Sequence, residues 1–195
     1  PIPRWTALAA SKHMKYHIKN LDNIIETKKV SHFFFYGHSM GGYICTRLSS
    51  HSNNIPYNIP LSGLILESPL MLYSKIFEEI SNQLKIPSAI RPFHLSRVFR
   101  DIRSMLPPHA QDNRLAQFDV PEWGVPLAPT LCLQAKTDSR LGREHYDAAV
   151  SSFSGEIQLT HHLIESLPHS GAKTNSEREK LLIQWLETFD SLLLR

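Results

Sequence analysis

The most constraining stretch of the sequence is residues 33–42, FFFYGHSMGG, in which four consecutive aromatic residues lead into a serine flanked by glycines. A continuous apolar run is typical of a strand covered on both faces, as in the middle of a parallel sheet, and we expect a strand at 32–36. Gly37 and Gly41 stand two positions before and after Ser39, where a tight turn requires small residues. The letters YICTRL that follow predict a helix, so strand, tight turn and helix are expected in succession.

A serine on such a turn is a candidate nucleophile. The turn lifts the hydroxyl of Ser39 clear of the backbone. The N-terminus of the following helix favours negative charge, and the N–H of Met40 would point to the place where an oxyanion forms. Gly42 would let the helix lie close to the sheet. The alternative interpretation is a strand followed by an ordinary glycine loop.

Composition excludes several classes of protein. The chain has 195 residues, which is enough for one sizeable core and too few for two comfortable domains. The formal net charge is +3 and no Lys/Arg-rich block occurs, so no nucleic-acid partner is expected. Cys45 and Cys132 both lie in apolar surroundings, which predicts buried, reduced thiols and favours a cytoplasmic protein. No apolar run approaches the ~20 residues of a membrane span.

Further strands and helices alternate along the chain. Apolar runs typical of strands occur at 62–66, 127–135 and 158–164. Helical periodicity occurs at 12–28 and again near the C-terminus, where Ser176 and Glu179 have the spacing of a capping box. Strands separated by helices predict an α/β fold, with a mostly parallel sheet flanked by helices.

A helical insertion interrupts this alternation. The segments 71–84 and 94–106 both carry apolar residues at helical spacing, and prolines at 87, 92, 107 and 108 separate and end them. The connection is longer than an ordinary loop. We therefore expect a core made of residues 1–69 and 123–195, with residues 70–122 forming a helical cap or lid.

A nucleophilic serine needs a base, and the base needs an orienting carboxylate. Where this turn belongs to a triad, the acid precedes the histidine in the chain. Asp138 lies in the loop just beyond the predicted strand at 127–135 and is the candidate acid. Glu67, directly after the run at 62–66, is the alternative acid. A loop aspartate that only caps a turn remains the structural alternative for Asp138.

The candidate base is a histidine near the end of the chain. His169 lies in a loop, LPHSG, between the last predicted strand and the last predicted helix. His161 and His162 fall inside that strand, where one would point to each face, and a core or surface role is expected for them. His38 is next to the serine, but adjacent side chains diverge on a tight turn, so we expect it to support the oxyanion loop or to pack nearby.

The motif GHSMGG, the aspartate after a strand and the histidine before a terminal amphipathic helix, with a helical cap between them, resemble the α/β-hydrolase superfamily. The chain is most similar to its monoacylglycerol lipase, lysophospholipase and serine aminopeptidase group. The resemblance implies Ser39 as nucleophile, the Met40 N–H as oxyanion donor, Asp138 as acid and His169 as base. It also implies hydrolysis of carboxylic esters of a lipid-like acyl substrate, without a cofactor or a metal.

The chain departs from this superfamily at its beginning. Members have several strands before the nucleophile strand, and a loop among them supplies the second oxyanion N–H, whereas 38 residues precede Ser39 here. We therefore expect the C-terminal part of a longer protein, or a degenerate member. The alternative function is a catalytically inactive binding protein of the same fold, or an inactive fragment.

The predicted cap indicates what kind of substrate and partner to expect. Its apolar helix faces would cover the active site and form an acyl-binding slot, or they would only pack on the body. Its arginines form either a solvated basic face or a surface that attracts an anionic head group or a membrane. They are Arg91, Arg97, Arg100 and Arg103. The expected partner is a small-molecule ester or lipid, with peripheral membrane contact through the cap as the second interpretation.

Overall fold

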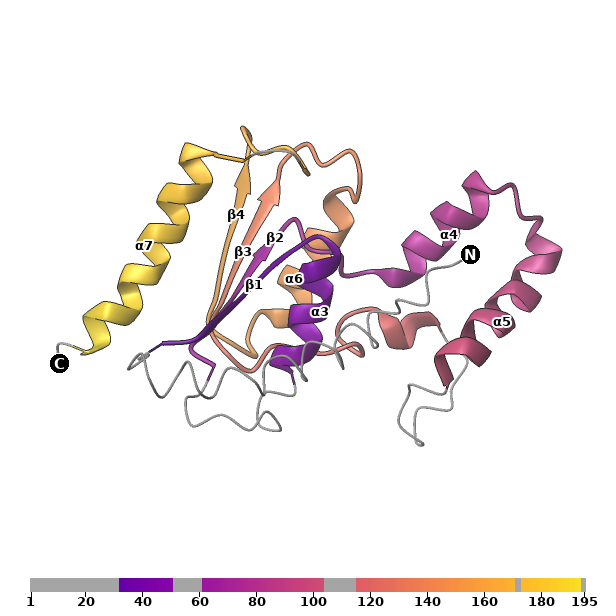
Figure 1. The fold of residues 1–195 in the computed structure, drawn as a ribbon, viewed down its shortest axis with the longest axis horizontal. Coiled ribbons are helices and arrows are strands. Elements are labelled where there is room, and N and C mark those ends of the chain that lie inside the picture. The colour runs from indigo at the N-terminus through magenta and orange to yellow at the C-terminus, as the bar shows by residue number, and fades with distance from the viewer. Residues whose placement is uncertain (1–31, 51–60, 104–114, 171–172, 194–195) are drawn as a thin grey trace.

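The structure is a computed structural model that describes residues 32–50, 61–103, 115–170 and 173–193. The helix predicted at 12–28 lies outside these residues. Element labels are those of Figure 1.

In the described part of the chain four parallel strands form the sheet, in the order β1-β2-β3-β4. Their bounds are Phe34–His38 for β1, Gly63–Glu67 for β2, Thr130–Ala135 for β3 and Leu159–Ile164 for β4. Because all four run in the same direction, their carboxyl ends meet at one edge of the sheet (Figure 1). The predicted α/β class with a parallel sheet is confirmed, although β1 extends two residues further than expected, up to the residue before Ser39.

Helices cover both faces of the sheet (Figure 1). Helices α3 (Met40–Ser49) and α6 (Arg143–Phe153) pack on one face, and α7 (Ser176–Leu193) packs on the other. Every residue of β2 and β3 is buried, which explains why their sequences are continuous apolar runs rather than alternating ones. Cys45 and Cys132 are buried free thiols, as predicted, and burial raises their pKa values to about 11 and about 12.

One glycine lets α7 lie close to the sheet. A Cβ atom at Gly63 would lie 2.6 Å from the ring of Trp185, a distance that real Cβ contacts do not reach. The Trp185 ring also packs edge-on against Phe34 and Phe189. The small residue in β2 therefore makes room for the largest side chain of α7.

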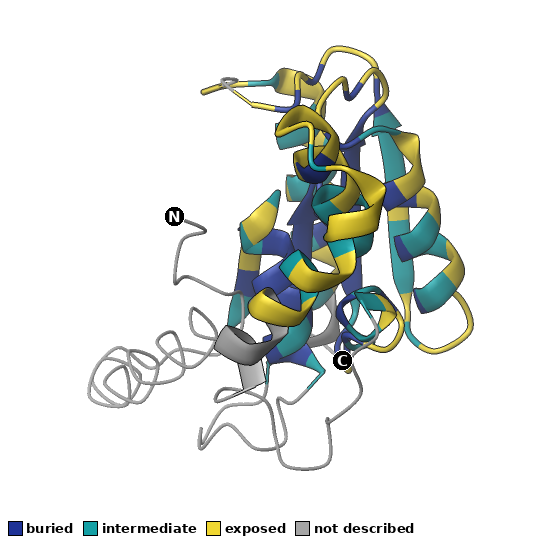
Figure 2. Cartoon of the chain, turned by 90° about the vertical axis from the view of Figure 1, so that its right-hand side faces the viewer, coloured by how far each residue is buried: buried dark blue, intermediate teal, exposed yellow. Residues whose placement is uncertain are grey.

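Helices α4 (Tyr73–Gln83) and α5 (Arg91–Arg103) stand between β2 and β3 in the chain and lie to the side of the sheet (Figure 1). They face the viewer in Figure 2, where nearly all of their described residues are exposed or partly exposed, while β2 and β3 are buried. Helix α5 begins before Pro92, earlier than predicted, because proline is tolerated in the first turn of a helix. The 3-10 helices η2 (Ser88–Ile90) and η3 (Leu115–Phe118) complete this part of the chain.

The two ends of this helical segment meet. Leu72 and Asp119 form an antiparallel bridge, and the N–H of Val120 donates to the carbonyl of Met71 at 3.1 Å. The carboxylate of Asp119 accepts the backbone N–H of Ser74 at 2.8 Å. The segment therefore leaves and rejoins the sheet region at a single place.

The start of α7 corrects one sequence prediction. Asn175, rather than Ser176, caps the helix, because its Oδ1 accepts the N–H of Arg178 at 2.9 Å. Glu179 does reach back as a capping-box residue would, but it accepts the N–H of Asn175 at 3.1 Å. Both Asn and Ser are good N-cap residues, so the sequence alone placed the cap one position too late.

Candidate active site

Ser39 occupies the turn between β1 and α3. Its backbone has φ 51° and ψ −117°, a region that a residue with a side chain rarely enters. The turn is held by backbone bonds: the N–H of Ser39 donates to the carbonyl of Glu67 at 3.0 Å, and its carbonyl accepts the N–H of Leu70 at 3.1 Å. Strained backbone that neighbouring structure holds in place is a feature of functional sites.

At two of the three glycines around Ser39 there is no room for a side chain. A Cβ atom at Gly37 would lie 2.6 Å from backbone atoms of Gly41 and Gly42, and one at Gly42 would lie 2.8 Å from Cβ of Pro69. A Cβ atom at Gly41 would meet no atom within 4 Å. The expectation that Gly41 must be small is therefore wrong as a steric argument, whereas Gly37 and Gly42 are held to glycine by close approach.

Met40 is the first residue of α3, and its side chain is exposed. The N–H groups of a helix's first turn have no acceptor within the helix, so they are available to a ligand. The positive end of the helix dipole lies at the same place. The position of the Met40 N–H therefore suits a developing negative charge beside Ser39.

Asp138 and His169 are brought together by the topology. Asp138 follows β3, and His169 lies between β4 and α7. The Nδ1 of His169 lies 2.7 Å from Oδ2 of Asp138, and both side chains are buried. A carboxylate can only accept, so Nδ1 of His169 carries a proton, and in the neutral form of the ring Nε2 is the acceptor.

The carboxylate of Asp138 is held in its ionised form. Burial alone would raise the pKa of Asp138, but hydrogen bonds from the N–H of Leu141, from His169 and from the N–H of Arg140 outweigh it and lower the pKa below its ordinary value. The two backbone bonds are 2.9 Å long and both reach Oδ1. Oδ2 accepts from His169 and also from Nε2 of Gln134, at 2.8 Å.

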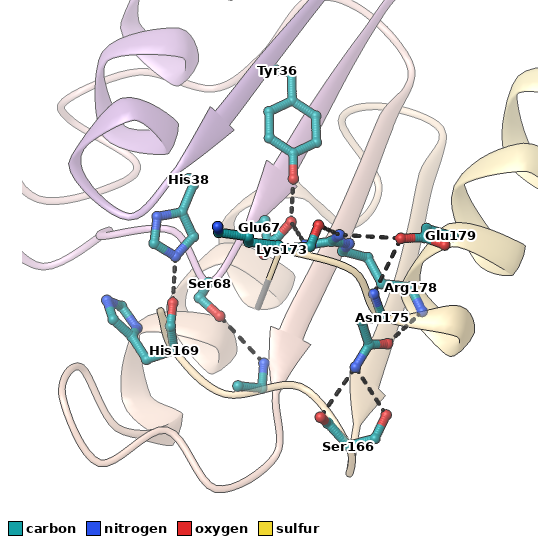
Figure 3. Close-up of polar contacts among 11 residues, drawn as sticks. Tyr36, His38, Glu67, Ser68, Ser166, His169, Lys173, Asn175, Arg178 and Glu179 are labelled. Atoms are coloured by element: carbon teal, nitrogen blue, oxygen red, sulfur yellow. Dashed lines mark hydrogen bonds and ion pairs between the residues drawn. The ribbon is translucent and has the colours of Figure 1, made fainter. Parts of the chain in front are cut away.

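The loop that carries His169 is held at two places (Figure 3). At His169 the Nε2 of His38 donates to the backbone carbonyl, and the two rings lie 5.2 Å apart between centroids. Near the ends of the loop the Nδ2 of Asn175 donates to the carbonyl and the hydroxyl of Ser166, at 3.0 and 3.1 Å. His38 therefore packs against the histidine loop, one of the two roles expected for it.

The alternative acid and bases have other partners. Glu67 is buried and accepts from the hydroxyl of Tyr36, and Arg178 lies 3.3 Å from its Oε1 (Figure 3). His161 pairs through Nδ1 with the hydroxyl of Tyr146 at 2.6 Å. His162 lies in β4 opposite Leu133. Among the described residues, none of these three is hydrogen-bonded to Asp138 or His169.

The side chain of His38, the residue before Ser39, links the serine turn to the loop of His169. His38 immediately precedes Ser39 and touches His169, so the histidine loop lies against the serine turn. No hydrogen bond of the Ser39 hydroxyl is present among the described residues. In ligand-free sites such bonds are often long and tighten only when substrate binds.

Two buried side chains near the site were not anticipated from the sequence. Gln134 is a polar residue within the apolar run of β3, which was the available signal for it. His145 lies on α6, and its Nδ1 accepts the N–H groups of Met71 and Leu72 at 2.9 and 3.1 Å. Burial, followed by the positive charge of Lys75, lowers the pKa of His145 to about 4. No pattern in the sequence distinguished His145.

Within residues 32–50, 61–103, 115–170 and 173–193, no cluster of three or more His, Cys, Asp or Glu side chains is arranged to hold a metal ion. No helix in the same part of the chain combines the length and the apolar character needed to cross a bilayer.

Comparison with known proteins gives the fold. No model of a protein family matches the sequence, and no curated protein matches it. The carboxylesterase Cest-2923 from Lactobacillus plantarum has a TM-score of 0.58 at 14% identity, over 93% of this chain and 68% of that chain. Vibralactone cyclase has a TM-score of 0.56 at 13% identity, over 93% of this chain and 56% of that chain.

A third similar structure is the alpha/beta hydrolase domain-containing protein 10 from mouse, with a TM-score of 0.52 at 11% identity, over 90% of this chain and 68% of that chain. These similarities, together with the parallel sheet and its flanking helices, define the fold as that of the α/β hydrolases. At such low identity they show the fold alone, and function has to be argued from the site.

Proposed function

We propose that this chain is a serine hydrolase of carboxylic esters that acts through Ser39, His169 and Asp138. The observation that carries the proposal is the buried 2.7 Å bond between His169 and Asp138, in a loop that His38 attaches to the serine turn. A buried histidine–carboxylate pair beside a strained, glycine-flanked serine is the arrangement that activates a hydroxyl nucleophile.

In this proposal each residue has a role. Asp138 keeps the proton of His169 on Nδ1, so that Nε2 accepts the proton of the Ser39 hydroxyl as its oxygen attacks the ester carbonyl carbon. The N–H of Met40 stabilises the oxyanion of the tetrahedral intermediate. His169 returns the proton to the departing alcohol and leaves an acyl-serine. Water, deprotonated by His169, then releases the acid and restores Ser39.

We propose a lipid-like acyl substrate, of lysophospholipid or monoacylglycerol type, with residues 70–122 as a cap over the site. Support comes from the place where this segment starts, since the N–H of Leu70 donates to the carbonyl of Ser39 itself. The segment leaves and rejoins the sheet region at one place, as a separable cap would. Met40, next to the nucleophile, leaves 41% of its surface exposed and offers an apolar contact for an acyl chain.

The same segment supports peripheral membrane contact. Four large apolar side chains are exposed in this segment. They are Ile80 on α4, Leu84 at its end, Ile90 on η2 and Phe93 on α5. The exposed bases Lys85 and Arg97 lie in the same segment and would attract anionic lipid. Vesicles of phosphatidylglycerol should therefore retain the protein better than vesicles of phosphatidylcholine, and Phe93→Asp should weaken that retention. Equal retention of both proteins on both vesicles would contradict the contact.

The catalytic proposal is tested with a fluorophosphonate probe and a p-nitrophenyl ester. The unaltered protein should be labelled and should hydrolyse the ester, and Ser39→Ala should lose both, by several powers of ten in turnover. Ser151→Ala, an exposed serine on α6, is the matched control and should behave as the unaltered protein. Labelling of Ser39→Ala at the normal rate would refute the proposal.

A second candidate is a binding protein of the same fold without catalysis. The Ser39 hydroxyl has no hydrogen bond to any residue that the structure describes, which favours this candidate, because a nucleophile that never meets its base does not react. This candidate predicts no labelling by the probe, together with a raised unfolding temperature when a non-hydrolysable ester analogue is added. Labelling at Ser39 would exclude it.

A further inference from the structure

Gln134 is a buried amide that the proposed chemistry does not use. It lies on β3 with none of its surface exposed, on the same face of the strand as Cys132, toward α3 and α6. An amide among apolar side chains destabilises the fold unless its polar atoms are hydrogen-bonded. A methionine or leucine would fill this place without that penalty, so the amide calls for an explanation.

The orientation of the amide is determined by its neighbours. Its Nε2 lies 2.8 Å from Oδ2 of Asp138 and 3.3 Å from the carbonyl of Ala135. Both partners can only accept, so the atom between them must be the nitrogen, and a flipped amide would oppose oxygen to oxygen. The Oε1 of Gln134 is then left buried and without a partner among the described residues. The chain thus leaves one buried carbonyl oxygen unpaired in order to give Asp138 a donor.

We propose that Gln134 is a positioning residue that acts on His169 through Asp138, an inference that rests on the proposed hydrolase function. Oδ1 of Asp138 is fixed by two backbone N–H groups, and Oδ2 is shared by Gln134 and His169. The amide of Gln134 occupies one side of Oδ2 and leaves the other side to the imidazole. It therefore determines the direction from which His169 approaches, and hence where Nε2 points.

Removal of this donor has a defined kinetic consequence. The carboxylate can then rotate about its remaining bonds, and Nε2 of His169 loses alignment with Ser39. A small misplacement of this kind lowers turnover roughly 10- to 100-fold. Because Gln134 is fully buried and its amide contacts Asp138 and Ala135, it should not touch the substrate, and KM should be unchanged. The carboxylate also attracts the imidazole proton more strongly without a competing donor, so the acid limb of the kcat/KM profile should move to higher pH.

The test uses Gln134→Met, which removes the donor and the unpaired oxygen at nearly constant volume. The matched control is Thr130→Val, because Thr130 is a fully buried polar residue on the same strand whose hydroxyl bonds to the carbonyl of Ala128 instead. Gln134→Met should lower kcat roughly 10- to 100-fold and shift the acid limb, with KM unchanged. Thr130→Val should change neither. If Gln134→Met does not fold, Gln134→Asn keeps an amide that is too short to reach Asp138 and should show the same loss.

A spectroscopic measurement separates this proposal from the catalytic one. The Nδ1 proton of His169, bonded to a carboxylate, should give a downfield proton resonance that does not depend on turnover. Gln134→Met should shift or broaden this resonance, whereas Ser39→Ala should abolish turnover and leave it in place. An unchanged resonance and pH profile in Gln134→Met, or an equal loss in Thr130→Val, would overturn the role of Gln134. Absence of Ser39-dependent turnover with a resonance that still responds to Gln134→Met would instead refute the hydrolase.

Discussion

His38 holds the main chain of His169. The Nε2 of His38 donates to the backbone carbonyl of His169, and the two rings pack at 5.2 Å between centroids. His38 is also the last residue of β1, immediately before Ser39. The residue next to the proposed nucleophile therefore determines the position of the loop that carries the proposed base, although the two are 131 residues apart in the chain.

His38→Phe should lower the rate of fluorophosphonate labelling about 10-fold, because it keeps the ring contact and removes the bond to the loop. The control is His94→Phe, since His94 on α5 stacks on Phe77 of α4 and makes this contact through its ring. The control should label at the normal rate. Normal labelling of His38→Phe would mean that the bond to the carbonyl is not needed to position His169.

Gly37→Ala and Gly41→Ala form a second pair of variants. Gly37→Ala should lower the free energy of unfolding by about 1–3 kcal/mol, because its Cβ would overlap the backbone of Gly41 and Gly42. Gly41→Ala should leave stability unchanged or raise it by up to about 1 kcal/mol, because the site is open and helical. Urea denaturation measures both. Equal destabilisation by the two substitutions would show that the turn, and not the local contact, requires glycine.

Local patterns were sufficient to locate the strands and the serine turn. The run ending at Tyr36 and the glycines around Ser39 act over a few residues, so their consequences are visible in the sequence. Asp138 and His169 could be located by their places after strands, because parallel topology brings such loops to one edge of the sheet. Their hydrogen bond follows from that topology.

Other features depend on contacts between distant segments and could not be read from the chain. The role of His145 requires the N–H groups of Met71 and Leu72, which reach it only in the folded protein. The open space at Gly41 depends equally on what surrounds it. The cap of α7 needed a choice between two adjacent residues of similar propensity, which only the side-chain geometry could settle.

Asn175→Ala should destabilise the protein by about 1 kcal/mol through loss of the helix cap, and should also lower the labelling rate. The second effect is expected because Asn175 also holds Ser166 at the far end of the His169 loop. Ser176→Ala is the matched control, since Ser176 does not cap the helix. It should change stability by less than about 0.5 kcal/mol. A larger loss in Ser176→Ala than in Asn175→Ala would reverse this assignment.

His145 should make stability depend on pH. Burial and the charge of Lys75 lower its pKa from 6.5 to about 4 in the folded protein, so between these values the unfolded chain binds a proton that the folded protein does not. Its contribution is therefore complete above about pH 6.5 and is lost as the pH falls toward 4, at about 1.4 kcal/mol per pH unit and about 3 kcal/mol in total. Protonation of Nδ1 would also remove the acceptor of the Met71 and Leu72 N–H groups.

Three other charged or titratable groups act on His145, and they do not obscure the test. Lys75 and His169 oppose its protonation and Asp138 favours it. The pKa of Asp138 is lowered from its ordinary value of 3.8, so the stability that Asp138 contributes is lost only in more acidic solution, as the pH falls below about 3.8. His145→Gln, which does not titrate, should therefore flatten the decline in the free energy of unfolding between about pH 6.5 and about pH 4. Urea denaturation across this window measures the difference between the two proteins, and parallel curves would show that the His145 ring takes up its proton as readily in the fold as in the unfolded chain.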